Sequence, residues 1–221
     1  MKNDISQQKT VTPLRFLYFF WAIIGAFSLM YVPSKLIVFE DAAITANNIV
    51  ANELLFRLGI AGSLLTQLLW IFVVLLLYKL FAKVNHNQSI LMVVLALVSI
   101  PIAMISVLGK TAALLSLDNL EQMMFFLNLN VQGILIASIF WGLWLFPLGY
   151  LIYKSGYFPK FVGVAVVIAG FGYTIDFFVK IILPNLNIAP VAEILKLGEM
   201  VFVFWIIIKG VRLQKINKRK Y

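Results

Sequence analysis

Hydrophobic residues run along this chain in six long stretches, separated by short segments in which charged, amide and turn-forming residues gather. Each stretch has about the 20 residues that an α-helix needs to cross the hydrocarbon core of a bilayer. The pattern predicts an all-α, polytopic membrane bundle with six transmembrane helices. The predicted spans are residues 14–33, 54–78, 89–113, 125–152, 161–183 and 192–208.

Composition supports lipid as the main solvent of this chain. Hydrophobic residues make up 62% of it and charged residues 12%, whereas soluble domains have roughly 45–50% and about 25%. Its 221 residues leave room for the spans and little else, so we expect a single transmembrane domain over residues 1–221. The first apolar run, from Leu14 to Val32, is too long for the core of a signal peptide and is interpreted as a retained span.

The distribution of basic residues predicts the orientation. With the N-terminus inside, 13 of the 18 Lys and Arg residues fall on inner segments, six of them in the tail 209–221. The positive-inside rule therefore places both termini in the cytoplasm (N-in/C-in). The lipid bilayer is the expected partner, with anionic lipid at the basic tail. A nucleic-acid partner is not expected, because such proteins carry their basic face on a soluble fold.

Several local features carry structural predictions. Pro101, near the middle of the third span, predicts a bend or opening of the helix. The fourth span is longer than a bilayer requires, so it must tilt, kink at Pro147 or project beyond the lipid. Asp41 or Thr45 is expected to cap a short helix in the outer segment before the second span. Asp118 and Glu121 have the spacing of a capping box.

Ionisable and amide side chains gather in the outer parts of the spans. Each ionisable group within a span costs roughly 2.5–3.5 kcal/mol on insertion scales, so it requires a partner or a function. We expect these side chains to converge inside the bundle as a polar layer open to the outside. The candidate residues are Glu53, Arg57, Lys110, Asn128, Gln132, Asp176, Lys180, Lys196 and Glu199.

Spacing predicts how the charges in this layer pair. Asp176 and Lys180 are four residues apart, and Lys196 and Glu199 are three apart, so each pair shares a helix face. Arg57 remains charged at any accessible pH. It is therefore expected to contact Asp176 or Glu199 on another span.

These residues are compatible with three functions. The polar layer either binds or transports a small polar ligand or lipid headgroup, or its charges are structural ion pairs of a non-catalytic subunit or scaffold. The third and weakest reading is an intramembrane enzyme that uses Asp176 and Glu199 as acid and base. The chain has no cysteine, and its one histidine, His86, falls in a predicted cytoplasmic turn. No metal site, cofactor or catalytic triad is therefore predicted, and the sequence favours a protein that is not an enzyme.

Several stretches resemble a bacterial multi-pass family known as domain of unknown function 4386. The residues that carry the resemblance are Val32 to Leu36, Asp41, Thr45, Asn48, Leu55 to Gly59, Trp141 to Pro159, Gly163, Gly170, Tyr173 and Asp176. The resemblance covers nearly the whole chain. It implies an inner-membrane protein and carries no activity with it.

Overall fold

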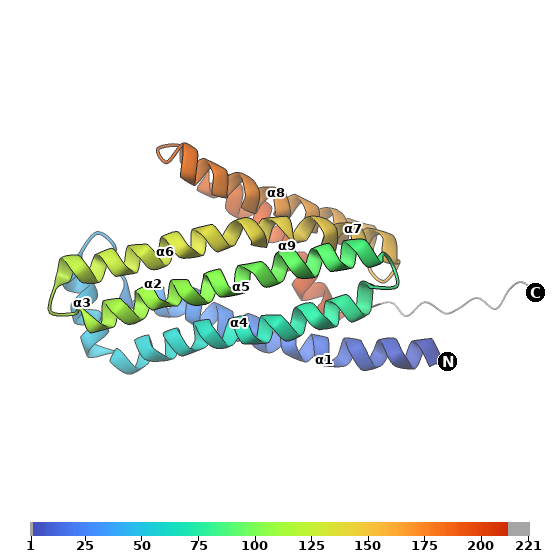
Figure 1. The fold of residues 1–221 in the computed structure, drawn as a ribbon, viewed down its shortest axis with the longest axis horizontal. Helices are drawn as coiled ribbons and strands as arrows, with labels where there is room; N and C mark the ends of the chain where they lie inside the picture. The colour runs from blue at the N-terminus through green and yellow to red at the C-terminus, as the bar shows by residue number, and fades with distance from the viewer. Residues whose placement is uncertain (1, 212–221) are drawn as a thin grey trace, which may run out of the picture. The chain divides into compact units, whose positions relative to one another are not determined.

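The structure is a computed structural model that describes residues 2–211, and within that range the chain is helical without a β-strand. The elements, labelled in Figure 1, are α1 (Lys2–Gly25), the π-helical segment η1 (Ala26–Tyr31), α2 (Val32–Leu36), α3 (Ala42–Ala51), α4 (Glu53–Phe81), α5 (His86–Leu115), α6 (Leu120–Leu143), α7 (Leu145–Ser155), α8 (Lys160–Ile182) and α9 (Ala189–Ile208). The tail residues Arg212, Lys215, Lys218, Arg219 and Lys220 lie outside the described residues, so the lipid contact expected there stays a prediction.

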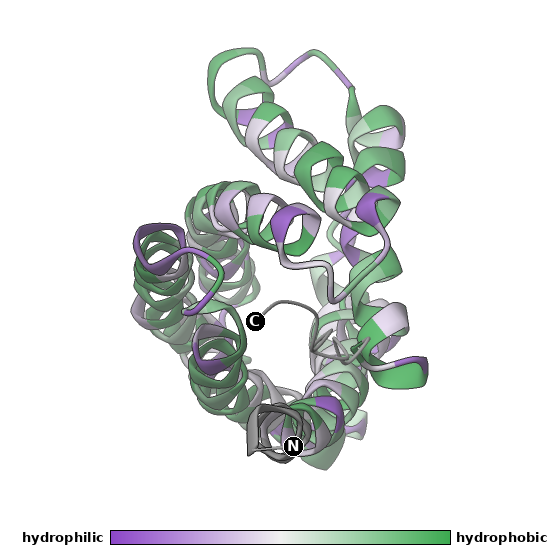
Figure 2. Cartoon of the chain, turned by 90° about the vertical axis from the view of Figure 1, so that its right-hand side faces the viewer, coloured by the Kyte–Doolittle hydropathy of each residue, from purple (hydrophilic) through white to green (hydrophobic). Residues whose placement is uncertain are grey.

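Five stretches of helix in the described part of the chain are long and apolar enough to cross a membrane. They are Thr10–Leu36, Glu53–Phe81, His86–Leu115, Leu120–Ser155 and Lys160–Ile182. Large apolar side chains on them point away from the protein, among them Met30, Phe72, Ile105, Phe125 and Ile182. Figure 2 shows the same property as helices that are hydrophobic over most of their length. An apolar surface of this extent requires lipid around it, which confirms a polytopic helical membrane protein.

The predicted sixth span corresponds to α9, which differs from the other five in its charge. It has 20 residues and is strongly apolar, but Glu193, Lys196 and Glu199 lie within it. The five stretches above each contain an 18-residue window with at most two charged residues. Length and composition therefore identify α9 as an apolar helix without identifying it as a crossing.

The chain divides into two compact units, and helices α1, α4, α5 and α6 contribute residues to both. Unit 1 holds Met1–Tyr18, Val73–Ala96 and Ile139–Tyr221, and includes α7, α8 and α9. Unit 2 holds Phe19–Phe72 and Leu97–Ser138, and includes α2 and α3.

Unit 2 has an apolar core at the ends of its helices. The core joins Val32, Leu36, Ala46, Ile49, Phe56, Ala113, Leu114, Met123 and Leu127. Asp41 caps α3 as predicted, because its carboxylate accepts a hydrogen bond of 2.9 Å from the amide of Ile44. Thr45 instead fixes the preceding turn, since its hydroxyl bonds both backbone groups of Val38 at 2.9 Å. At the start of α6, Asn119 accepts from the Gln122 amide at 3.0 Å, so the cap is this asparagine and the predicted Asp118–Glu121 capping box is wrong.

Unit 1 is held together by close approach of helix backbones at glycines. A Cβ atom on Gly163 of α8 would lie 2.8 Å from the carbonyl oxygen of Gly149 on α7. On another side of α8, a Cβ on Gly172 would lie 2.7 Å from the Leu195 side chain, and one on Gly198 would collide with the carbonyl of Ala165. Later positions on α8 thus meet earlier positions on α9, so the two helices lie side by side and antiparallel. Small residues permit this contact, as they do between helices in lipid.

Two prolines act differently on their helices. Pro147 accounts for the end of α6. It has no amide proton for the carbonyl four residues earlier, and its ring clashes with that carbonyl, which belongs to Leu143, the last residue of α6. The predicted fourth span is therefore interrupted only at Trp144, whose backbone stays right-handed helical (φ −67°, ψ −23°), so that α6 and α7 still form one stretch, Leu120–Ser155. By contrast, α5 continues through Pro101 from His86 to Leu115, so the helix does not open there, and the predicted bend stays a prediction. Proline removes a single backbone hydrogen bond, and neighbouring groups in a bundle can compensate for it.

The beginning of the first span and the end of α9 meet in unit 1. The Arg15 guanidinium donates to the carbonyl of Ile207 at 2.9 and 2.7 Å and to that of Ile208 at 3.2 Å. These carbonyls belong to the last turn of α9, which has no partner for them within the helix. Nearby along the same helices, the rings of Tyr18 and Phe202 meet edge to face, with centroids 6.0 Å apart. The C-terminal end of α9 is thereby fixed beside α1.

Candidate functional site

The nine predicted site residues fall into both units. Unit 1 contains Asp176 and Lys180 on α8 and Lys196 and Glu199 on α9, and the structure brings these four together. Unit 2 contains the other five, Glu53, Arg57, Lys110, Asn128 and Gln132, and the structure separates them by burial.

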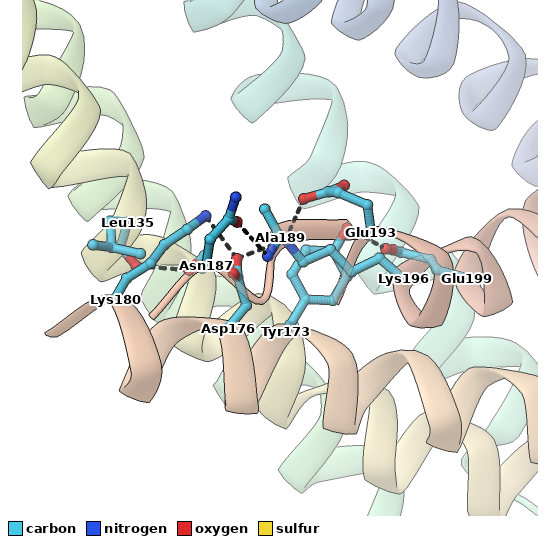
Figure 3. A network of polar contacts seen from close by, with 10 residues as sticks. Leu135, Tyr173, Asp176, Lys180, Asn187, Ala189, Glu193, Lys196 and Glu199 are labelled. Carbon is cyan, nitrogen blue, oxygen red and sulfur yellow. Dashed lines mark hydrogen bonds and ion pairs between the residues drawn. The ribbon is translucent and has the colours of Figure 1, made fainter. Parts of the chain in front are cut away.

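The α8–α9 network is a chain of polar contacts centred on the Asp176 carboxylate (Figure 3). One oxygen, Oδ2, accepts from Lys196 at 2.7 Å and from Lys180 at 2.9 Å. The ammonium of Lys196 also contacts Glu193 at 2.8 Å. The Lys180 pair lies within α8, as its spacing predicts, whereas the Lys196 pair joins α8 to α9.

The Asp176–Lys196 pair is the most buried of these contacts. The side chains are 5% and 14% exposed, so neither charge is fully solvated. The other carboxylate oxygen, Oδ1, is also buried and has no hydrogen-bond partner among residues 2–211. A carboxylate in which one oxygen accepts two hydrogen bonds and the other accepts none can still accept a hydrogen bond from a further donor.

Glu199 is bound by a tyrosine and not by the predicted lysine. The Tyr173 hydroxyl donates to Glu199 at 3.0 Å, and the Lys196 ammonium lies 5.2 Å from the centre of the same tyrosine ring. Side chains tilt toward the N-terminus of their helix, so Lys196 reaches back to Glu193, three residues earlier, rather than forward to Glu199. The predicted Lys196–Glu199 pair is therefore wrong.

The network has more acids than bases. Asp176, Glu193 and Glu199 supply three carboxyl groups, and Lys180 and Lys196 supply two ammonium groups. If all five groups are ionised, the network carries one surplus negative charge. Glu199 is itself buried, which makes that surplus costly in the absence of a positive partner.

Arg57 does not need the distant acid that the sequence suggested. Its Nε donates to Glu53 at 2.7 Å, four residues earlier on α4. The arginine side chain is 59% exposed. This exposure shows that the premise of Arg57 as a buried charge is wrong, and the acid that pairs with it lies on its own helix.

The two amides predicted on α6 face outward. Asn128 and Gln132 are exposed, and the Asn128 amide bonds to the Met124 carbonyl of its own helix at 2.9 Å. The buried amide on this helix is Asn130, which donates to the Ser106 carbonyl of α5 at 2.7 Å. Spacing alone could not tell which of these faces points inward, because apolar residues surround all three.

Lys110 is the predicted residue that is most deeply buried in unit 2. The residue is 7% exposed, and its ammonium reaches the Ser63 hydroxyl of α4 at 3.3 Å. Within the described chain it forms no ion pair. Ser63 donates its own proton to the Gly59 carbonyl at 2.8 Å. A lysine in a membrane span with only a neutral partner is unusual, because placing an unpaired charge there costs free energy.

No group of three or more His, Cys, Asp or Glu side chains that could hold a metal ion occurs among the residues that the structure describes.

Comparison with known proteins extends over most of the chain. Residues 16–210 match the family model described as a domain of unknown function, DUF4386. A protein of Archaeoglobus fulgidus, described as uncharacterized, is 34% identical over 162 residues, which are 72% of this chain and 87% of that protein. No solved structure matches the chain. The chain belongs to the DUF4386 family of multi-pass membrane proteins.

Proposed function

We propose that this membrane protein binds a small polar ligand with a positive charge at the α8–α9 network. The observation that carries the proposal is the buried Asp176 carboxylate, whose Oδ1 has no hydrogen-bond partner in the described chain. A ligand with an ammonium group would donate to this oxygen and offset the surplus negative charge beside it.

The proposal includes a topology of six crossings with both termini in the cytoplasm. Five crossings would leave α1 and the end of α9 on opposite sides of the membrane. The contacts of Arg15 with Ile207 and Ile208 support an even number, because they hold the beginning of the first span beside the end of α9. The antiparallel packing of α9 along α8, an apolar span, supports α9 as the sixth crossing.

The charges of α9 are compatible with that crossing. Lys196 is neutralised by Asp176 across the helix contact, Glu193 lies one turn from the helix start with an exposed side chain, and Glu199 is hydrogen-bonded to Tyr173. Pairing of this kind reduces the insertion cost of each group. The orientation would put the network in the outer part of the membrane and the basic tail at the cytoplasmic surface, where it would contact anionic lipid.

A structural function is the second candidate. The Asp176–Lys196 bridge joins two helices at 2.7 Å, which favours a clamp in a non-catalytic subunit. In that case the surplus charge of the network would be removed by a proton and not by a ligand.

Native mass spectrometry of the protein purified in mild detergent separates the two functions. We expect wild-type protein to retain a small cationic adduct and the Glu199→Gln variant to lose it. Glutamine has the shape of glutamate, can still accept from Tyr173, and leaves the Asp176 ion pairs untouched. The matched control is Glu53→Gln, in the exposed pair of α4, which should retain the adduct. Protein without an adduct, or an adduct that persists in Glu199→Gln, would leave the clamp as the function of the network.

A further inference from the structure

We infer that the contact between α4 and α5 in unit 2 is a binding site for a singly charged oxyanion, such as a phosphodiester or carboxylate, held by Lys110, Ser63 and Gln67. This site is separate in residues and opposite in charge from the α8–α9 network, and it does not depend on the function proposed above.

The first argument is the uncompensated charge of Lys110. Its side chain is nine-tenths buried in a membrane span, and Ser63 Oγ at 3.3 Å is its hydrogen-bond partner. Across the described residues no carboxylate lies within ion-pair distance of the ammonium. The remaining donors of the ammonium therefore need acceptors, and one anion would also balance the charge.

The second argument is an unused amide beside the same serine. Gln67 follows Ser63 by four residues and so lies on the same face of α4. The residue is 7% exposed, and its amide forms no hydrogen bond within the described part of the chain but keeps some accessible surface. An amide NH2 group without a bonded acceptor, and an ammonium whose one acceptor is a neutral hydroxyl, are complementary to the oxygens of an anion.

The direction of the lysine side chain points its ammonium along α4 to the side of Ser63 on which Gln67 lies. Helices α4 and α5 are joined by a short turn and run antiparallel, so Gln67 lies from Ser63 toward the beginning of α5. The Lys110 side chain tilts the same way, because side chains point toward the N-terminus of their helix. Lys110 thus reaches into the unit rather than toward the nearer end of α5, where a snorkelling lysine would place its charge.

The surroundings favour an anion that arrives on an acyl chain. One turn beyond Lys110, Ala113 and Leu114 belong to the apolar core that closes this end of unit 2 with α2 and α3. On the α6 side, Gly109 approaches so closely that an added Cβ would lie 2.6 Å from the Phe126 carbonyl oxygen. Apolar packing thus borders Lys110 both toward the end of α5 and toward α6, as it would border the headgroup of an amphiphile.

Thermal unfolding of the full chain in detergent tests the inference with three probes. Dioleoylphosphatidylglycerol supplies a phosphodiester on a lipid, dioleoylglycerol has the same acyl chains without the phosphoglycerol headgroup, and inorganic phosphate is the free anion. We expect the first to raise the melting temperature of wild-type protein and dioleoylglycerol to leave it unchanged. A rise with inorganic phosphate alone would identify a free anion as the ligand of the same site.

Variants assign the effect to these residues. Lys110→Met should weaken binding of the stabilising probe about tenfold or more, because it removes a charge-assisted hydrogen bond. Gln67→Leu should weaken this binding less. The control is Lys35→Met, an exposed lysine of α2 in the same unit. Without a probe, Lys110→Met should melt no lower than wild type, since it removes a buried, unpaired charge. Unchanged binding by Lys110→Met, an equal response to dioleoylglycerol, or a lower melting temperature of Lys110→Met without any probe would overturn the inference.

Discussion

Lys196→Met is expected to lower the free energy of unfolding by about 3 kcal/mol, the lower end of the range for breaking one partner of a buried ion pair. The variant leaves the Asp176 carboxylate buried at 5% exposure, with only the half-exposed Lys180 to compensate it. The loss should not reach the upper end of the range, because Lys180 remains at 2.9 Å. Chemical unfolding in mixed micelles, followed by tryptophan fluorescence, measures the change.

Two further variants make this result specific to the pair. Adding Asp176→Asn to Lys196→Met should recover part of the loss, since it removes the stranded charge. Arg57→Met breaks the exposed pair with Glu53 and should cost no more than about 0.5 kcal/mol. A Lys196→Met variant as stable as Arg57→Met would show that the bridge between α8 and α9 contributes nothing to folding.

Gly198→Ala should destabilise the protein by about 1–3 kcal/mol, as overpacking of a close contact does. The new methyl group would collide with the backbone of Ala165, whose carbonyl carbon would lie 2.8 Å from it. Helix propensity acts in the opposite direction, because alanine is favoured over glycine by up to about 1 kcal/mol in a helix interior. The loss would therefore arise from separation of α8 and α9.

Gly25→Ala in α1 is the matched control for this substitution. A Cβ at that position would meet its nearest neighbour, Thr66 Cγ2, at 3.7 Å, which is ordinary contact. The same chemical change should therefore be neutral or slightly stabilising there. If both variants lose the same stability by thermal unfolding, close backbone approach at Gly198 is not what holds α9 to α8.

The course of the helices could be predicted well because membrane helices are specified by long apolar runs. The predicted span 54–78 lies within α4 and 89–113 lies within α5. The effect of a proline was harder to predict, because both Pro101 and Pro147 interrupt an apolar run and only the second ends a helix. The difference depends on packing around each proline, which a single sequence does not contain.

The candidate site could be predicted only in part because spacing identifies a shared face and not a direction. The Asp176–Lys180 pair followed from spacing, whereas the choice of Lys196 between Glu193 and Glu199 required the tilt of the side chain. Asn130 and Gln67 were missed, since an amide in an apolar span gives no sign of whether it points inward. The four-residue spacing of Ser63 and Gln67 was the one available signal for the second.

Cysteine accessibility most directly tests whether α9 is a sixth crossing, on which the proposed position of the polar network depends. The chain has no cysteine of its own, so a single cysteine can be placed at Ser6, Asn185 or Asn217. Each replacement reports on which side of the membrane its own segment lies. In intact cells, a membrane-impermeant thiol reagent should label Asn185→Cys, in the turn between α8 and α9, and should label Ser6→Cys and Asn217→Cys only after lysis. Labelling of Asn185→Cys and Asn217→Cys from the same side would show that α9 does not cross the membrane.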